Sequence, residues 1–377
     1  MASPSFSICF IGRNEAKTLP RALDSIEEFI DRGGEVCYLD TGSTDGTPFI
    51  AERYGARVEA VGDRFLSEIT PGDALAINER FVVDAEDPVV KQGDKLFRFD
   101  DARNYCADRL ATNDMVSWMD CDEVVTKMDI DKIESLIKEG FNQFEYNFVY
   151  AHGDNGEEVI KFVQSKFYNK QRMIWTGIIH EVLAGKGNRK FLEESIFKLE
   201  HYQNVETNRG GYLKGLALDC FRRQKEDRQS HYFAREMMWH GRPKSAMKEF
   251  ARHLTLGVWP PERAQSMIYI GDCLLTLGKE SEAIQWLHKA FQEDGGRREA
   301  LIKLAYLYTR RGEWMRVASY CEAALVIPWA GYYMNNKAHY EYVPHELLGE
   351  AYWMLGNREK SKEHFDIAAT YRPQGNN

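Results

Sequence analysis

The sequence predicts an α/β domain with a mainly parallel sheet, followed by an all-α domain built from helical repeats. Strand-like apolar runs alternate with helix-like stretches over the first half of the 377-residue chain, which is typical of a parallel sheet covered by helices. From about residue 229, helix-like stretches follow one another without strands. In this half the step from Gly278 to Gly312 is 34 residues, and a recurring period of this length indicates a solenoid of repeated units.

Length, charge and cysteine usage narrow the class of protein. A chain of 377 residues fits two domains better than one. The net charge of −9 argues against broad binding to nucleic acid, which needs a basic face. Seven scattered cysteines without a CxxC pair indicate free thiols in a reducing compartment. The sequence shows no signal-peptide pattern and no apolar run of about 18 residues, so we expect a cytoplasmic protein without a membrane span.

The first half contains short apolar runs that predict strands, each followed by polar residues. Ligands of such sheets bind beyond the carboxyl ends of the strands, so these polar residues mark a candidate cleft. The predicted strands are 6–11, 35–39, 57–61 and 115–119, and the predicted helices between the first three are about 19–26 and 48–54.

Residues 62–99 fit this alternation poorly, because they carry prolines, glycines and many acidic residues. We interpret them as an insertion or long loop near the cleft. A lid, an acceptor-binding element and a plain surface loop are all compatible with this composition.

The second half repeats a helix-turn-helix pattern. Small or apolar residues follow each turn, which lets paired helices approach closely and bury one face on the next unit. An aromatic segment at 329–342 lengthens the last step, and it predicts an acceptor groove, a dimer contact or core filling. The expected turns lie at Gly241, Gly278, Gly312 and Gly356.

An acidic, glycine-rich turn, Asp40–Thr47 (DTGSTDGT), follows the second strand. The carboxylate of Asp40 can accept hydrogen bonds from a nucleobase edge or a ribose. The same residues also suit a tight turn in which Thr47 or Asp45 caps the next helix. The motif therefore predicts a nucleoside contact or a well-capped turn.

Two aspartates, Asp120 and Asp122, follow the apolar run 115–119. Residues two apart in an extended segment project to the same side. Carboxylate oxygens with this spacing suit Mg²⁺ or Mn²⁺, and such an ion would also neutralise a diphosphate. The spacing alone is weak because it occurs by chance in acidic proteins, but its place after an apolar strand favours a metal site.

Arg103 is expected in the first turn of a helix, capped by Asp100 or Asp101 and off the buried stripe. A guanidinium near the positive end of a helix can donate in a fork to a base or a diphosphate. The alternative is an arginine that pairs with Asp100 or Asp101. The predicted apolar stripe consists of Ala102, Tyr105, Cys106 and Leu110.

His180 and Glu181 lie together, and His201 follows a strand-like piece at 195–199. A carboxylate in the cleft can take the proton from an acceptor hydroxyl. A neutral imidazole can complete a metal shell. The residues leave open whether His180 or His201 is the ligand, and a lone histidine is more often structural.

Taken together, the motifs resemble family 2 glycosyltransferases. The resemblance covers about the first 205 residues and implies a GT-A (Rossmann-like) mixed sheet. Residues 229–377 resemble tetratricopeptide repeats, which a subset of this family carries, and 206–228 would form a linker helix. The resemblance rests on five motifs in fixed order: Ile8–Glu15 (ICFIGRNE), DTGSTDGT, Ala102–Asn104 (ARN), Asp120–Glu123 (DCDE) and Gly177–Glu181 (GIIHE).

The resemblance implies transfer of a sugar from a nucleotide-sugar donor, most simply a UDP-sugar, with Mn²⁺ or Mg²⁺ as cofactor. Glu181 would be the general base of one in-line displacement that inverts the anomeric centre. Asp122 would be the firmer metal ligand beside Asp120 and His201, with His180 as the alternative. The residues expected against the donor are Ile11, Arg13, Asn14, Glu15, Asp40, Gly42, Ser43, Asp45, Arg103, Asp120 and Cys121.

The acceptor and two rival functions stay open. A saccharide, a peptide, a lipid-linked glycan and a modified nucleobase are all compatible acceptors, and the repeats are expected to bind the acceptor, form a homodimer, or both. The alternative function is a repeat scaffold with an inactive first domain. A nucleotidyltransferase would need a glycine- and lysine-rich triphosphate loop, which residues 12–15 (GRNE) do not supply.

Overall fold

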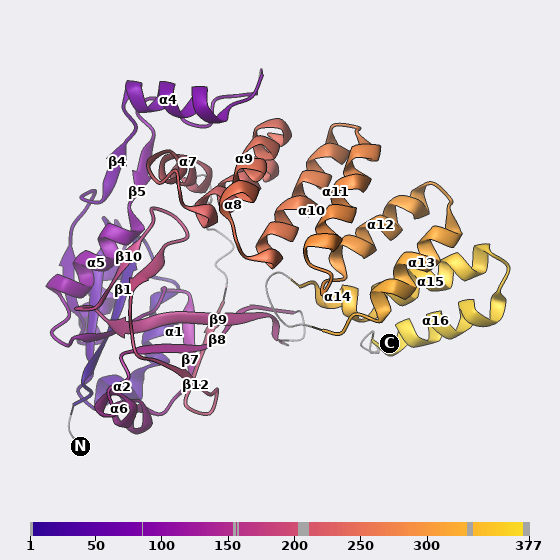
Figure 1. The fold of residues 1–377 in the computed structure, drawn as a ribbon. Coiled ribbons are helices and arrows are strands. Elements are labelled where there is room, and N and C mark those ends of the chain that lie inside the picture. The colour runs from indigo at the N-terminus through magenta and orange to yellow at the C-terminus, as the bar shows by residue number, and fades with distance from the viewer. Residues whose placement is uncertain are drawn as a thin grey trace. The chain divides into compact units, whose positions relative to one another are not determined.

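The computed structural model of the chain (Figure 1) describes residues 3–84, 86–153, 156, 158–202, 211–329 and 335–371. Backbone contacts divide it into two compact units. The first, called the sheet unit below, comprises Met1–Ala74 and Val90–Gly215, and the second, the helical unit, comprises Leu75–Val89 and Leu216–Asn377. The division differs from the predicted one because an internal segment of the first half belongs to the helical unit.

Among the described residues, nine strands form one mixed sheet in the order β3-β2-β1-β6-β9-β8-β13-β7, with β12 paired to β8. The first four strands in this order are mutually parallel. They are β3 (Arg57–Ala60), β2 (Glu35–Asp40), β1 (Phe6–Gly12) and β6 (Met115–Trp118), as the apolar runs predict. The coarse prediction of a mixed α/β sheet is thus confirmed.

The second half of the sheet is mixed in direction. β9 (Glu158–Asn169) runs antiparallel to both β6 and β8 (Gln143–His152). β13 (Phe197–His201) pairs in parallel with β8 and antiparallel with β7 (Glu123–Met128). β12 (Arg189–Leu192) adds to β8, and a separate hairpin is formed by β10 (Met173–Thr176) and β11 (Val182–Gly185).

Helices cover both faces of the parallel strands, so β1 is buried on both sides and its residues alternate between two apolar cores. Phe6, Ile8 and Phe10 pack in one core. Cys9 and Ile11 pack in the other. The helices of this unit are α1 (Leu19–Asp24), α2 (Glu27–Asp31), α3 (Thr47–Arg53), α5 (Phe99–Arg109) and α6 (Ile130–Lys138).

Residues 62–99, which are predicted to be an insertion or long loop, contain some regular structure. β4 (Leu66–Glu68) and β5 (Lys95–Phe97) form an antiparallel pair, and α4 (Pro71–Phe81) lies between them. The α4 start is capped reciprocally: Asp73 N donates to Thr70 Oγ1 at 3.1 Å, and that hydroxyl donates to the Asp73 carboxylate at 2.9 Å. A threonine whose hydroxyl accepts from the first turn of the helix, followed by proline at the first helical position, is a local signal for a helix start.

Helix pairs build the helical unit and confirm the predicted repeat. The four expected turn glycines have φ between 69° and 83°, the left-handed conformation that ends a helix. The pairs are α8 (Asp227–Trp239) with α9 (Pro243–Leu256), α10 (Pro260–Thr276) with α11 (Glu280–Glu293), α12 (Glu299–Arg310) with α13 (Trp314–Leu325), and α15 (Tyr342–Met354) with α16 (Arg358–Thr370). Further helices are α7 (Tyr212–Arg222), within the predicted linker, and α14 (Lys337–Tyr340). Part of the predicted linker (206–210) and of the aromatic segment (330–334) lies outside the described residues.

The segment Leu75–Val89 packs on α8 and α9. Phe81 stands edge-on to Phe233, with ring centroids 4.9 Å apart. The Glu86 carboxylate accepts hydrogen bonds from the backbone N–H groups of Lys244 and Ser245 at 3.0 and 3.2 Å. These N–H groups lie at the start of α9, where the helix itself provides no acceptor for them. The insertion therefore supplies a cap to the first helix pair.

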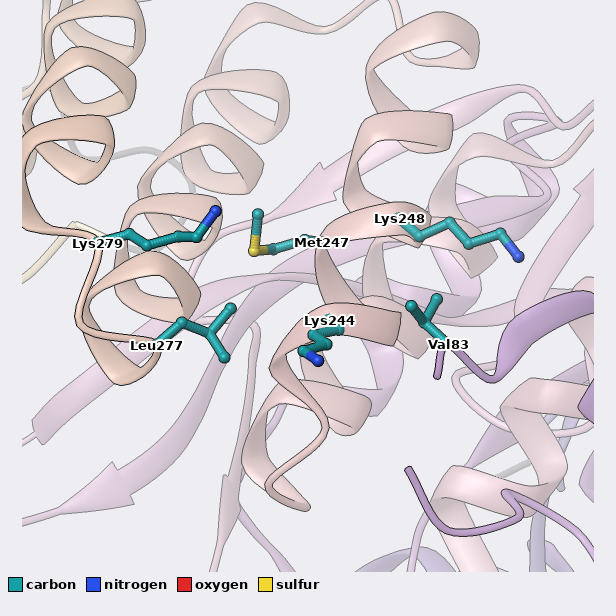
Figure 2. Close-up of a pocket in the computed structure, with 6 residues that line it drawn as sticks. All are labelled: Val83, Lys244, Met247, Lys248, Leu277 and Lys279. Carbon is teal, nitrogen blue, oxygen red and sulfur yellow. The ribbon is translucent and has the colours of Figure 1, made fainter. Parts of the chain in front are cut away.

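A pocket of about 580 Å³ lies beside this segment (Figure 2). Three of its lining residues are lysines, and their amines contact local acceptors: Lys244 bonds Asp84 at 2.7 Å, and Lys279 pairs with Glu282 at 3.2 Å. The pocket is lined by Val83, Lys244, Met247, Lys248, Leu277 and Lys279.

All seven cysteines are buried free thiols, as expected. In the part of the chain that the structure describes, no helix is long and apolar enough to cross a membrane.

A chain of buried polar side chains crosses the core of the first two helix pairs. His231 Nδ1 lies 2.7 Å from Ser266 Oγ, and that hydroxyl lies 2.9 Å from His253 Nδ1. Burial lowers the pKa of His231 well below its ordinary value of 6.5, and the nearby His253 and Arg235 lower it further. His231 is therefore neutral in the folded protein.

The stability of the helical unit is expected to fall in acid because of His231. Below pH 6.5 the unfolded chain takes up a proton at this position and the folded chain does not. The stability that neutral His231 contributes is therefore fully present above pH 6.5, and it is lost as the pH falls below that value. The loss approaches about 1.4 kcal/mol per pH unit. Urea unfolding between pH 7.5 and 5 should show a shallower pH slope for His231→Gln than for the unchanged protein. His240→Gln, at an exposed site, is the control, and equal slopes for His231→Gln and the unchanged protein would contradict the assignment.

Candidate functional site

The predicted motifs meet at the carboxyl edge of the sheet, where the strand order reverses between β1 and β6. Such reversals are where open α/β sheets bind ligands. Gly12 ends β1, and a Cβ there would stand 2.5 Å from Tyr38 Oη and 2.9 Å from Cys121 Sγ. The Cys121 thiol also lies 3.7 Å from the carbonyl oxygen of Ile11. The end of β1 therefore lies directly against the start of the Asp120–Asp122 motif.

Hydrogen bonds join the turn after β1 to the turn after β2. Asn14 N donates to Ser43 Oγ at 2.9 Å, and Thr44 N donates to Asn14 Oδ1 at 2.7 Å. Asn14 has a φ of 60°, which is unusual for a residue other than glycine. Arg13 is exposed and pairs with Asp63 at 3.5 Å. Residues predicted to contact the donor are thus brought together from two separate motifs.

Asp40 lies at the end of β2 and is buried. Its carboxylate accepts from the backbone N–H groups of Gly42 and Ser43 at 3.2 Å. Asp45 accepts from Thr47 N at 3.0 Å at the start of α3. These are the hydrogen bonds of the well-capped turn, and the predicted contact between Asp40 and a nucleobase stays a prediction.

Arg103 is only 6% exposed, so the expectation that it lies off the buried stripe of its helix is wrong. The physical reason is the β10–β11 hairpin, which packs on α5 and covers this face. The Arg103 guanidinium carbon lies 5.0 Å from the centre of the Trp118 ring and 5.3 Å from that of Trp175. Cation–π contacts of this kind favour a charged guanidinium away from water.

The two acidic residues before Arg103 do not cap its helix, which begins at Phe99 and places them inside the first turn. They face Arg98, at 3.5 Å for Asp100 and 3.2 Å for Asp101. Asp100 also accepts from Gly177 N at 3.0 Å. The alternative in which Arg103 pairs with Asp100 or Asp101 is therefore wrong.

Arg103 instead joins two other predicted site residues. Its Nε donates to Glu181 Oε1 at 2.7 Å, and its Nη2 donates to Asp120 Oδ1 at 2.9 Å. Its Nη1 is buried, and among the described residues it has no hydrogen-bond partner. A buried donor without an acceptor is costly, so Nη1 indicates a place for a ligand atom or a water molecule.

Asn104 positions the loop that carries Glu181. Its amide donates to the carbonyl oxygen of Trp175 at 2.8 Å, and its own oxygen accepts from Trp175 N at 2.9 Å. This pair of bonds fixes the edge of β10 on α5. The ARN motif thus combines an arginine that bonds Glu181 and Asp120 with an asparagine that holds the neighbouring strand.

Lys166 is a residue of the site that none of the five sequence motifs contains, and Glu123 is present only as the last residue of the DCDE motif. Lys166 Nζ donates to Asp120 Oδ2 at 2.9 Å and also contacts Glu123 Oε1. Glu123 Oε2 in turn accepts from Asp120 N at 2.8 Å. The only sequence signal for Lys166 is a charged residue directly before two aromatic residues (SKFYN), which becomes informative only when the partner strands are known.

The charged groups in this network shift one another's pKa values. Burial opposes ionisation of Asp120, but Lys166 and Arg103 outweigh it and hold the pKa of Asp120 well below its usual range. Burial raises the pKa of Glu123 to about 7, against the opposing effect of Lys166. Burial also acts against a charged Lys166, yet Asp120 and Glu123 raise its pKa. The half-exposed Asp120 and the buried Lys166 are therefore a firmly ionised pair.

Asp122 lies beside His201, whose Nε2 is 3.1 Å from Asp122 Oδ2. The other ring nitrogen of His201, Nδ1, is 3.0 Å from the carbonyl oxygen of Tyr150, which fixes the ring. His180 has a φ of 55°, and its ring stands edge-on to Tyr212 at 5.7 Å. His201 thus lies against Asp122, the second residue of the aspartate pair.

The donor set fits a divalent cation in its chemistry and charge. Carboxylate oxygen and imidazole nitrogen are ligands of Mn²⁺, and the five carboxylates of this region outnumber its two permanent cations. As arranged here, no three histidine, cysteine, aspartate or glutamate side chains in the described ranges converge as a metal site. The carboxylates are Glu15, Asp120, Asp122, Glu123 and Glu181, and the cations are Arg103 and Lys166.

The pKa of Glu15 reflects the excess of negative charge in this region. Burial raises its pKa, and the nearby charges of Asp122, Asp45 and Asp120 raise it further, while Thr18 opposes the shift. A carboxylate under this repulsion is stabilised by any cation that binds nearby.

Comparisons with known proteins concern the repeats. No family model matches the chain. A stretch of 57 residues is 46% identical to a TPR repeat-containing protein of Synechococcus elongatus, and it covers 15% of this chain and 13% of that protein. Together with the helix-turn-helix period, this match supports tetratricopeptide repeats in the helical unit.

Solved structures of other proteins are similar to under half of this chain. MamA matches with a TM-score of 0.35 and 16% identity, over 45% of this chain and 95% of its own. BtubC from P. vanneervenii matches with a TM-score of 0.36 and 17% identity, over 45% and 77%. YrrB, described as a TPR protein with an unusual peptide-binding site, matches with a TM-score of 0.32 and 16% identity, over 43% and 77%.

Removal of the Asn104 side chain is expected to loosen the site. Asn104→Ala leaves the N–H and C=O of Trp175 without their partners, which costs about 1–3 kcal/mol for each buried group. Thermal unfolding should therefore show a lower Tm than that of the unchanged protein. Asn113→Ala, which removes one hydrogen bond to Ser7, is the matched control. A Tm loss no larger than in that control would contradict the role of Asn104.

Proposed function

We propose that this protein is a metal-dependent glycosyltransferase that transfers a sugar from a nucleotide-sugar donor, with a UDP-sugar as the first candidate. The observation that carries the proposal is the Glu181–Arg103–Asp120 chain of ion pairs. It joins three motifs that lie far apart in sequence, at the edge of the sheet where ligands of α/β proteins bind. A network in which a buried arginine keeps one unused donor is typical of a binding site rather than of a packed core.

The donor would lie against the turns after β1, β2 and β6. The Asp40 turn would face the nucleoside, and Asp120 with Arg103 would face the ribose and diphosphate. Burial and the bond to Asp120 hold the guanidinium in one orientation. A fixed fork of N–H groups recognises phosphate oxygens well.

Glu181 would act as the general base. In the proposed reaction the acceptor nucleophile loses its proton to the Glu181 carboxylate and forms a bond to the anomeric carbon, while the bond from that carbon to the nucleoside diphosphate breaks. One displacement inverts the anomeric centre and needs one base. The Arg103 Nε bond to Glu181 at 2.7 Å supports this role because it orients the carboxylate.

Asp122 and His201 would hold the divalent cation. Bound there, Mn²⁺ or Mg²⁺ would stabilise negative charge on the departing diphosphate. Their contact at 3.1 Å brings an oxygen and a nitrogen ligand together, whereas both oxygens of Asp120 bond to protein cations. Asp120 would then orient Arg103 rather than serve as a principal metal ligand.

The helical unit would bind the acceptor, pair two copies of the chain, or both. The alternative function is a repeat scaffold without catalytic activity. The observation that favours it is the lysine-lined pocket of about 580 Å³ in the helical unit. Nucleotide binding distinguishes the two functions, because a scaffold does not need to bind a nucleotide.

Glu181→Gln is expected to stop transfer and leave donor binding nearly unchanged. The amide keeps an oxygen for Arg103 but cannot take a proton, so turnover should fall by about 10²- to 10⁴-fold. Release of UDP from a panel of UDP-sugars without acceptor measures turnover, and calorimetry with UDP and Mn²⁺ measures binding. Glu145→Gln on β8, which pairs with Arg189, is the control. Undiminished turnover in Glu181→Gln would remove this residue from the mechanism.

Asp122→Ala is expected to remove the metal dependence of nucleotide binding. With Mn²⁺ present, UDP should bind to the variant about 10- to 100-fold more weakly, the worth of one charged contact. Calorimetry with and without Mn²⁺ checks this, with Asp114→Ala as the control. The scaffold alternative predicts that UDP with Mn²⁺ leaves the Tm of the unchanged protein where it was, whereas a ligand at 100 times its Kd would stabilise the protein by about 2.7 kcal/mol.

A further inference from the structure

Lys166 is a charged residue at a buried position of the sheet, where packing alone would favour an apolar side chain. It lies in β9, a central strand of the sheet, and is 6% exposed. Its neighbours Phe167 and Tyr168 are fully or almost fully buried. Burying an ionised pair in such a place gains little stability over a well-packed apolar pair, so Lys166 calls for a reason other than packing.

The contacts of Lys166 aim it at the candidate site. Its Nζ bonds Asp120 Oδ2 at 2.9 Å, while Arg103 Nη2 bonds the other oxygen, Oδ1, also at 2.9 Å. One carboxylate therefore holds two cations on its two sides. The cations come from elements far apart in the chain, α5 and β9.

Both cations keep unused donor capacity. An ammonium has three N–H groups, and Lys166 bonds two carboxylates, Asp120 and Glu123. In Arg103, Nη1 is buried, and among the residues that the structure describes it has no acceptor. A group with several anionic oxygens could bond both cations without breaking either pair with Asp120.

A diphosphate has this chemistry, and it would need such help here. Five carboxylates gather near the site, and they would repel an anion. Arg103 and Lys166 place two fixed positive charges against Asp120, the first residue of the aspartate pair. A divalent cation at Asp122 and His201 would add further positive charge but would not remove the need for direct donors.

We propose that Lys166, together with Arg103, binds the diphosphate of the nucleotide donor. This inference rests on the proposed function and adds a residue to it. Lys166 is a binding residue, and its ion pair with Asp120 holds it in place when no nucleotide is present. This role predicts that removal of the Lys166 charge weakens the binding of a nucleoside diphosphate more than the binding of the free nucleoside.

The test is calorimetry on the full chain with Mn²⁺ and three probes: uridine, UMP and UDP. For Lys166→Met, the affinity for UDP should fall by about 10- to 100-fold, the effect of losing one charge-assisted hydrogen bond. The affinity for uridine should change less than about threefold. Lys166→Arg, which keeps the charge, should recover part of the loss for UDP.

Two further variants separate binding from folding. Glu123→Gln combined with Lys166→Met removes the buried carboxylate that would otherwise lose its counter-ion, so this pair preserves the fold if Lys166→Met alone does not. Lys161→Met is the matched control, because Lys161 lies on the same strand and also pairs with two carboxylates, Glu158 at 2.8 Å and Glu194 at 2.6 Å. Circular dichroism melting measures the fold of every variant.

The outcomes are distinguishable. If the unchanged protein binds neither UMP nor UDP with Mn²⁺, the proposed function fails for a UDP-sugar donor, and this inference fails with it. If it binds UDP and the folded Lys166 variants bind it equally well, Lys166 is not a diphosphate ligand and the proposed function stands. An equal loss for uridine, UMP and UDP would make Lys166 a structural residue and would also overturn the inference.

Discussion

The site depends on one carboxylate that holds two cations. Both oxygens of Asp120 are bonded, one to Arg103 and one to Lys166, each at 2.9 Å. Through these bonds the loop after β6 is tied to α5 and to β9, and Arg103 carries the connection on to Glu181 at 2.7 Å. Because Arg103 and Lys166 are buried, loss of Asp120 would leave two buried cations without the partner that they share.

The topology of the sheet makes this network possible. The strand order reverses beside β1, which brings the turns after β1, β2 and β6 to one edge. β9 then runs antiparallel along β6, so a side chain in its buried half reaches the residues that follow β6. The β10–β11 hairpin covers Arg103 and is fixed by Asn104. Parallel strands create the site, and antiparallel additions supply its remaining charges.

The helical unit follows a simpler physical rule. Each helix pair ends its first helix at a glycine with positive φ, and each buries small or apolar residues against its neighbour. These features are local and recur along the chain, which is why their period is visible in the sequence. The segment 75–89 is the exception, since it lies early in the chain but packs with α8 and α9.

The sequence by itself determined the elements and the repeats. Apolar runs marked the parallel strands, glycines marked the helix turns, and the polar motifs after the strands marked the edge that carries the site. These predictions succeed because strand periodicity, turn chemistry and helix pairing are properties of a few neighbouring residues.

Only the tertiary structure decided which charges meet. The burial of Arg103 depends on a hairpin some 70 residues later, and the part played by Lys166 depends on the pairing of β9 with β6. The segment Leu75–Val89 joins the helical unit through Phe81 and Glu86, whose partners Phe233 and Lys244 lie far along the chain. Long-range strand pairing and packing bring such residues together, and no local pattern in one sequence records them.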